Sequence, residues 1–198
     1  MDAASPLTRP LRADARRNRE RVLEAARACF REDGSNAQMD DVASRAGVGV
    51  GTVYRHFPDK AALLEALISE RFREFAADGR RALEEDDVWE ALTSWLMRCG
   101  EWQESDRAFC EYLTNAIPHE TKALVAEREG LQEVDRLFMT KGKRAGVIRK
   151  DARPEDIPLI MTGIAATARV GGAAGSWRRH LMLALDGLKP TAGGKLPD

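Results

Sequence analysis

The sequence lacks a surplus of charge of either sign, because its 198 residues carry 31 Lys and Arg against 32 Asp and Glu, a formal net charge of −1. It also lacks any run near the roughly 18 apolar residues that a membrane-spanning helix needs. No apolar stretch follows the N-terminal arginines, so no signal peptide is visible. With 43% hydrophobic and 32% charged residues, the composition predicts a soluble globular protein. We expect it to be cytoplasmic.

Cysteine and histidine are scarce. The three cysteines, Cys29, Cys99 and Cys110, form no C-x-x-C pair, which argues against a disulfide framework or a zinc ribbon. Free cysteines are usually small buried hydrophobes, an interpretation we favour over a redox switch for Cys99 and Cys110. The three histidines have no neighbours at metal-ligand spacing, so we expect neither a metal nor a cofactor. A nucleophile–base pattern and a phosphate-binding glycine loop are missing too, which leaves an all-α enzyme only a remote alternative.

Apolar residues recur at helical spacing along nearly the whole chain, and no segment alternates with period two long enough for a strand. The predicted fold class is all-α. A first helix carries the stripe from Val22 to Phe30, and Asp87 and Glu90 form a capping box at the start of a helix from Val88. The other predicted helices are 39–46, 50–56, 59–83, 107–116, 120–145, 154–171 and 176–188.

Two of these helices are short and are joined by a turn at Gly47, which predicts a helix–turn–helix. In such a motif the second helix must enter a major groove while the first braces it. A small core is therefore required, and we predict that it consists of Phe30, Val42, Ala46, Val48, Val53, Phe57 and Leu63.

Charge is unevenly divided along the chain. Residues 1–31 contain eight arginines and four acids, whereas residues 61–198 carry 20 basic and 23 acidic groups. The near-zero total is an average over a basic and an acidic part, and it does not exclude nucleic-acid binding.

Three segments of the N-terminal part resemble one family. The sequences RERVLEAA from Arg19, MDDVA from Met39 and AGVGVGTVYRHFPDK from Ala46 are similar to the N-terminal domain of TetR-type transcriptional regulators. The match covers about residues 16–68 in order and without gaps. The resemblance implies a homodimer that places the third helix of each subunit in one half-site of double-stranded operator DNA. It also implies a variable C-terminal domain that binds a small molecule and dimerises through its last two helices.

The resemblance assigns DNA-contacting roles to individual positions. Phosphate contacts are implied for Thr52, Tyr54, His56 and Lys60, a close approach to the groove for Gly51, and base contacts for Val50 and Arg55. Gln38 stands where the family usually has Thr or Ser, so we expect it to cap the helix poorly while still able to donate to a phosphate. The predicted DNA-binding residues are Gln38, Val50, Gly51, Thr52, Tyr54, Arg55, His56 and Lys60.

The C-terminal part offers candidates for a ligand cavity and a dimer interface. The effector would be a small apolar or aromatic molecule, and no charged residue stands out as a buried anchor for it. The ligand-binding candidates are Trp95, Cys99, Phe109, Tyr112, Phe138 and Met161, with an ordinary core as the alternative. The dimer candidates are Ile160, Gly163, Ile164, Ala168, Trp177, Leu181 and Leu185, with an intrachain core as the alternative.

The sequence therefore predicts a three-helix DNA-binding domain followed by a larger helical ligand-binding and dimerisation domain. The expected organisation is a disordered arm (1–13), the helix–turn–helix domain (14–60), the second domain (61–188) and a disordered tail (189–198). The expected function is that of a homodimeric repressor released from its operator by a small-molecule effector. The alternative is an effector-independent regulator whose C-terminal domain only dimerises or binds a protein.

Overall fold

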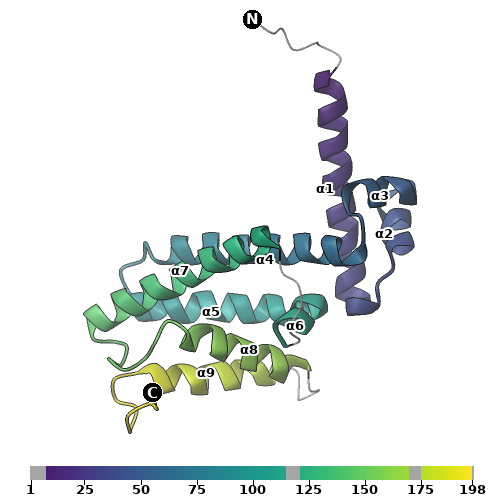
Figure 1. Cartoon of the computed structure of the whole chain (residues 1–198). Coiled ribbons are helices and arrows are strands. Elements are labelled where there is room, and N and C mark those ends of the chain that lie inside the picture. The colour runs from purple at the N-terminus through teal and green to yellow at the C-terminus, as the bar shows by residue number, and fades with distance from the viewer. Residues whose placement is uncertain (1–7, 115–120, 170–174, 198) are drawn as a thin grey trace, which may run out of the picture. The chain divides into compact units, whose positions relative to one another are not determined.

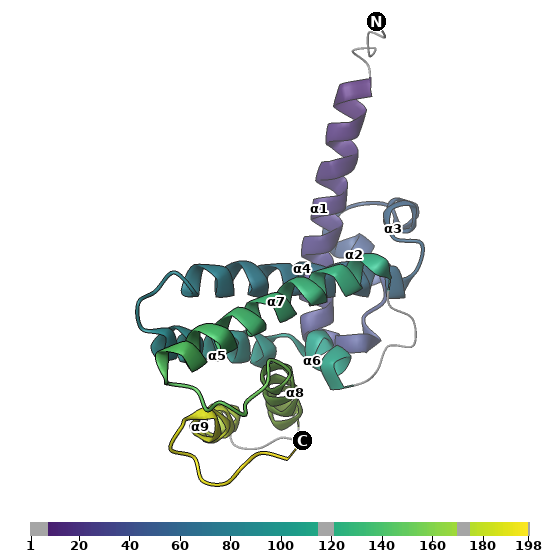
Figure 2. The same ribbon diagram turned by 60° about the vertical axis from the view of Figure 1, so that its left-hand side comes forward.

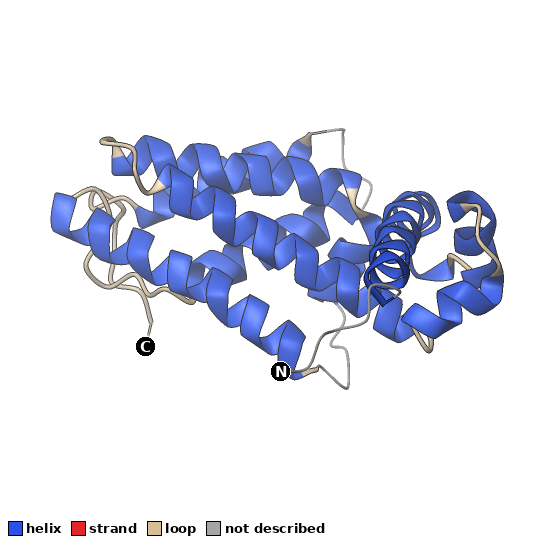
Figure 3. Cartoon of the chain, turned by 90° about the horizontal axis from the view of Figure 1, so that it is seen from above, coloured by secondary structure: helices blue, strands red, loops and turns tan. Residues whose placement is uncertain are grey.

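The computed structural model describes residues 8–114, 121–169 and 175–197. All regular structure in these ranges is helical (Figure 3), which confirms the all-α fold class. The elements are α1 (Thr8–Asp33), the 3₁₀ turn η1 (Gly34–Asn36), α2 (Met39–Ala46), α3 (Val50–His56), α4 (Lys60–Ala82), α5 (Val88–Ser105), α6 (Arg107–Thr114), α7 (Lys122–Ala145), α8 (Asp156–Arg169) and α9 (Ser176–Leu188). Residues 1–7 of the expected arm, and parts of the helices expected at 107–116, 120–145 and 154–171, lie outside the described residues.

The chain forms two compact units, Met1–Leu67 and Ile68–Asp198, and the division falls inside α4. In the first unit, α2 and α3 pack against each other and against the C-terminal part of α1 (Figures 1 and 2). The predicted core of this unit is confirmed, with Val48 only half-buried. Its buried members are Phe30, Val42, Ala46, Val53, Phe57 and Leu63.

Several helix ends follow from single residues, as the sequence predicts. Gly47 ends α2 with φ 62°, in the left-handed region that favours glycine. The Asp87 side chain accepts hydrogen bonds from the backbone N–H groups of Trp89 and Glu90 at the start of α5. Asp59 accepts from the N–H of Ala62 at 2.8 Å and so opens α4. Of these residues, Gly47 and Asp59 bracket α3 in the sequence.

The first helix starts earlier than the apolar stripe indicates. It begins at Thr8, within the segment expected to be a disordered arm, and the stripe begins only at Val22. Arg17 pairs with Asp14, and Arg16 pairs with Glu20 at 3.6 Å. Such pairs three and four residues apart support a helix that has no apolar face.

The second unit is a bundle in which α5 contacts α6, α7, α8 and α9. Trp95 of α5 stacks on Phe138 of α7, with ring centroids 5.0 Å apart, and its Nε1 donates to the carbonyl of Phe75 at 3.1 Å. Trp177 of α9 packs over Gly100 of α5. The stacking and the hydrogen bond of Trp95 thus join α5 to α7 and to α4. No helix among the described residues is long and apolar enough to cross a membrane.

The C-terminal segment is held by specific contacts, although the sequence analysis expected a disordered tail at 189–198. Arg149 forms an ion pair with Asp151 at 2.6 Å and donates to the carbonyls of Gly187 and Gly194. The N–H of Leu196 donates to Asp151 at 2.9 Å. The hydrogen bonds that Asp151 accepts from Arg149 and from the N–H of Leu196 hold its pKa well below its ordinary value. Polar contacts to one ion pair order a segment that has no apolar stripe.

Candidate nucleic-acid interface and cavity

The solvent-facing side of α3 carries the residues predicted to contact DNA. Tyr54 is 48% exposed and Val50 is 41% exposed. The backbone at Gly51 is open, because a Cβ atom built there meets nothing within 4 Å. Arg55 is also exposed, and Thr52, His56 and Lys60 are half-buried. The sequence has no acidic residue between Asp41 and Asp59, so α3 itself presents no negative side chain to a phosphate backbone.

The turn between α2 and α3 is braced by α1. Arg21 donates to the carbonyl of Ala46 at 2.6 Å and to that of Gly47 at 3.3 Å. These carbonyls belong to the end of α2, where a cation is favoured by the helix dipole. The structure thus gives Arg21 a positioning role that the sequence analysis did not anticipate.

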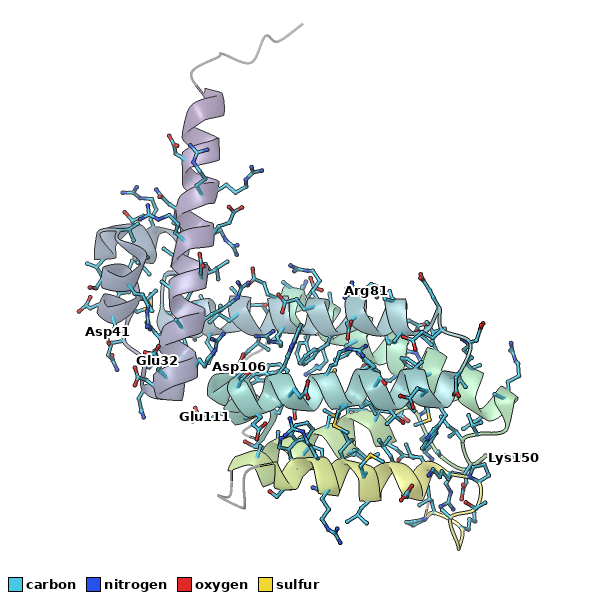
Figure 4. The ribbon with its side chains drawn as sticks, turned by 180° about the vertical axis from the view of Figure 1, so that it is seen from behind. Glu32, Asp41, Arg81, Asp106, Glu111 and Lys150 are labelled. Atoms are coloured by element: carbon cyan, nitrogen blue, oxygen red, sulfur yellow. The ribbon has the colours of Figure 1, made fainter. Side chains whose placement is uncertain are left out.

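A second brace joins α2 to the end of α1. Arg45 makes a bidentate pair with the Glu32 carboxylate, labelled in Figure 4, with N–O distances of 2.8 and 3.0 Å. Hydrogen bonding from Arg45 lowers the pKa of Glu32 and raises that of the guanidinium. A fork of two parallel bonds fixes direction as well as distance. Sequence reasoning missed this pair because its members lie 13 residues apart in different helices.

Two predicted residues flank the motif. Gln38 precedes α2, makes no capping bond, and donates instead to the carbonyl of Asn36 at 2.6 Å. Lys60 is the first residue of α4, and its ammonium lies 6.0 Å from the centroid of the Phe30 ring. A cation at a helix N-terminus is unfavourable to the helix dipole. Helix stability therefore does not account for a lysine at this position.

The second unit contains a cavity of about 530 Å³. Five of the six residues proposed for ligand binding line it. They are Trp95, Cys99, Phe109, Tyr112 and Met161. The sixth candidate, Phe138, does not line the cavity. It is fully buried and stacks on the Trp95 ring, which corrects the sequence-based expectation. Phe72 and Phe75 of α4 complete an aromatic wall, and each packs edge-on against Phe109 at 5.5 Å.

The cavity also contains a charged residue, which corrects the expectation that no buried anchor exists. Asp135 of α7 is 4% exposed, and its Oδ1 has no hydrogen-bond partner among the described residues. Burial raises its pKa to about 7, an effect that Arg136 partly opposes. The sequence held a signal, because Leu131, Asp135 and Phe138 are spaced i, i+4, i+7 on the inward face of α7.

The cysteines are free and buried. Burial, followed by the negative charges of Asp78 and Asp135, raises the pKa of the Cys99 thiol far above its ordinary value. A protonated buried thiol is a poor nucleophile. This environment favours the interpretation of Cys99 as a small hydrophobe of the cavity wall.

The dimer candidates fall into two groups. Ile160, Gly163 and Ala168 are half-buried. The single chain already buries the other four, Ile164, Trp177, Leu181 and Leu185, so these four belong to the intrachain core and are not available to a partner surface. Other apolar side chains of these two helices are exposed. They are Leu159 of α8, at 69%, and Leu183 and Met182 of α9, at 62% and 44%.

Comparison with known proteins agrees with the N-terminal motif and extends to the second unit. Residues 22–67 match the family model described as "Bacterial regulatory proteins, tetR family", and residues 87–190 match that of "Transcriptional regulator SbtR-like, C-terminal domain". HTH-type transcriptional regulators of Staphylococcus aureus are 46% identical over 54 residues, which is 27% of this chain and 29% of theirs. The chain thus matches less than a third of the length of these curated relatives.

Solved structures match over most of the chain. A TetR transcriptional regulator from Streptomyces coelicolor is 32% identical, with a TM-score of 0.65, and covers 88% of this chain and 99% of its own. A TetR transcription regulatory protein from Mycobacterium vanbaalenii is 31% identical, with a TM-score of 0.64. The match covers 91% of this chain and 99% of that protein's chain.

Fold, motif and comparisons together define a DNA-binding transcriptional regulator rather than an enzyme. The chain belongs to the TetR family of bacterial regulatory proteins.

Proposed function

We propose that the protein is a homodimeric repressor that binds operator DNA through α3 and leaves it when a small molecule occupies the cavity of the second unit. The observation that carries the proposal is the pairing of an exposed, acid-free α3 with a 530 Å³ aromatic cavity in one chain. A solid second core would favour the alternative, a regulator without an effector. The volume is in the range of small-molecule sites.

Helix α4 links the two functions in the proposal. It begins with Lys60, a proposed phosphate contact, and it carries Phe72 and Phe75 in the cavity wall. An effector that binds better to one orientation of α4 shifts the population of the dimer toward that state. The two recognition helices must sit about 34 Å apart to match successive major grooves, so a state with another separation loses operator affinity.

The proposed DNA contacts are tested with Tyr54→Ala and Lys60→Ala on a DNA site selected from a random pool by the full chain. Both variants should weaken binding about tenfold or more while the protein stays folded, because Tyr54 is exposed, Lys60 is half-buried, and neither side chain belongs to the core of the motif. Loss of the Lys60 phosphate contact should also reduce the salt slope of binding by about one for each subunit. Fluorescence anisotropy across a salt series measures both quantities.

Lys150→Ala is the matched control for Lys60→Ala. Lys150 is exposed in the second unit, where Figure 4 labels it, and takes no part in the proposed interface. Its removal should leave the slope unchanged. Wild-type affinity for both Tyr54→Ala and Lys60→Ala would refute the assignment of this face.

The dimer is proposed to form through the exposed apolar side chains of α8 and α9. A Leu159→Glu, Leu183→Glu double variant should sediment as a monomer, because two buried carboxylates per subunit would otherwise be desolvated in the interface. Both leucines are exposed in the single chain, so the double variant should still unfold cooperatively on heating.

Leu137→Glu provides the comparison. Leu137 is 44% exposed on α7 and lies outside the proposed interface. This variant should remain dimeric in sedimentation velocity. A double variant that sediments as the wild type does would move the interface away from these side chains.

A further inference from the structure

The polar groups of the cavity wall are unequally satisfied. Two side-chain donors of the wall have partners within the protein. Trp95 Nε1 donates to the Phe75 carbonyl, and Thr162 Oγ1 donates to the Pro158 carbonyl. Within the described ranges, Oδ1 of Asp135 and Oε1 of Gln103 have no hydrogen-bond partner. Both residues line the cavity and are at most 4% exposed.

Unsatisfied buried acceptors require an explanation, because buried oxygens are nearly always hydrogen-bonded. A carboxylate without a partner is the more demanding case, since burial without compensation disfavours the charged form. A ligand that brings hydrogen-bond donors would satisfy both oxygens, and a positively charged donor would also stabilise the ionised form of Asp135.

The cations that act on Asp135 and on Cys99, another residue of the lining, pair with other carboxylates. Arg136, whose charge acts on Asp135, pairs with Glu133 at 2.6 Å. On α5, Arg98 pairs with Asp78 at 2.9 Å. On α4, Arg71 pairs with Glu74 at 2.8 Å and with Asp106 at 3.3 Å; its buried Nε has no partner among the described residues, but Arg71 is not part of the cavity lining.

The remaining titratable groups of the lining do not supply the missing charge either. Cys99 and Tyr112 are neutral donors at most, and Arg128, a cation of the lining, is not among the groups that shift the pKa of Asp135. No described lining residue of α8 is charged. Asp135 is thus a buried carboxyl group in the wall of an aromatic cavity, and the only cation that shifts its pKa, Arg136, lies outside the lining and is paired with Glu133.

We propose that this cavity binds an organic cation, a protonated amine carried on an aromatic body. The ammonium N–H groups donate to Asp135, with Gln103 as the second acceptor. The body packs against Phe72, Phe109 and Trp95, whose ring faces also attract a cation. The inference deepens the proposed function, and it rests on that function only for the ligand's role as an effector.

The test uses three probes that share one ring system and differ in charge. They are 1-naphthylmethylamine, 1-naphthalenemethanol and 1-naphthoic acid, titrated calorimetrically into the full chain at pH 8. The amine should bind at least tenfold more tightly than the alcohol, and the acid should bind most weakly. Between pH 8 and pH 6 the affinity for the amine should fall about tenfold, because Asp135, with its pKa of about 7, becomes protonated.

Asp135→Asn should reduce the amine's affinity to that of the alcohol, abolish its pH dependence and leave the alcohol's affinity unchanged. Glu129→Gln is the control, because it removes an exposed carboxylate from the same helix. Equal binding of amine and alcohol, unchanged amine affinity in Asp135→Asn, or no binding of any probe would overturn the inference.

Calorimetry without DNA separates this inference from the proposed function. A cation that binds through Asp135 but leaves the DNA complex intact supports the ligand class and contradicts the effector role. Release of DNA by the neutral alcohol, without preference for the amine, supports the effector role and contradicts the ligand class.

Discussion

Replacing Asp135 with asparagine should change the stability difference between variant and wild type steadily in favour of the variant as the pH rises. Between pH 5 and pH 8 the difference in the free energy of unfolding should grow by about 3 kcal/mol in favour of the variant. The physical cause is the raised pKa of about 7 for this buried carboxyl, against an ordinary value of 3.8.

The sign follows from proton binding in the two states. Between the ordinary and the raised pKa, the folded protein holds a proton on Asp135 that the unfolded chain has released. The stabilisation from this protonated group is complete below the ordinary pKa and is lost as pH rises through about 7. Asparagine does not titrate, so the variant escapes this loss. Any fixed penalty for burying its amide is the same at every pH and cancels from the change.

Chemical denaturation of both proteins at several pH values measures the effect. The other ionisable groups are common to wild type and variant, so the difference isolates Asp135. Glu129→Gln again controls for the loss of a carboxylate from α7. Parallel stability profiles for wild type and Asp135→Asn would contradict the raised pKa.

A methyl group at Gly100 should be the most damaging small substitution in α5. A Cβ atom at this position would lie 2.7 Å from Cε3 and 2.8 Å from Cη2 of Trp177, and closer still to Cζ3. Trp177 is 1% exposed, so other side chains enclose its ring and must also shift if it moves. Overpacking costs about 1–3 kcal/mol or more, and contacts this short correspond to the upper part of that range, above the roughly 1 kcal/mol that alanine gains over glycine inside a helix.

Gly130→Ala is the same chemical change in a helix with room for it. The nearest atom to a Cβ there is Nη2 of Arg80, at 3.9 Å. This variant should therefore gain about 0.5–1 kcal/mol from helix propensity. Thermal denaturation should place Gly100→Ala below the wild type and Gly130→Ala above it. Equal midpoints for the two variants would contradict the rigid packing of Trp177.

The sequence predicts the helix–turn–helix well because its determinants are local. Gly47, Asp59 and the apolar positions of α2 and α3 each specify their structure within a few residues of chain. The ion pair of Arg45 and Glu32 cannot be predicted in this way, because it forms only once two helices have packed together.

The second unit is less predictable for the same reason. An apolar stripe identifies the inward face of a helix, but it does not tell a core contact from a partner contact. Trp177 and Leu181 therefore appeared equally suited to a dimer interface, although the chain buries both itself. Asp135 was overlooked because acidic residues usually lie outside, and only its neighbours along the stripe place it inside.

All three native cysteines are buried, so thiol-specific reagents should react with them slowly in the folded protein. A cysteine introduced at an exposed position such as Arg55 would be the one fast-reacting thiol of each chain. A spin label there would attach without removal of the native residues. In a dimer, the distance between two such labels would report the separation of the recognition helices. Pulsed electron paramagnetic resonance could measure this distance as a ligand is added.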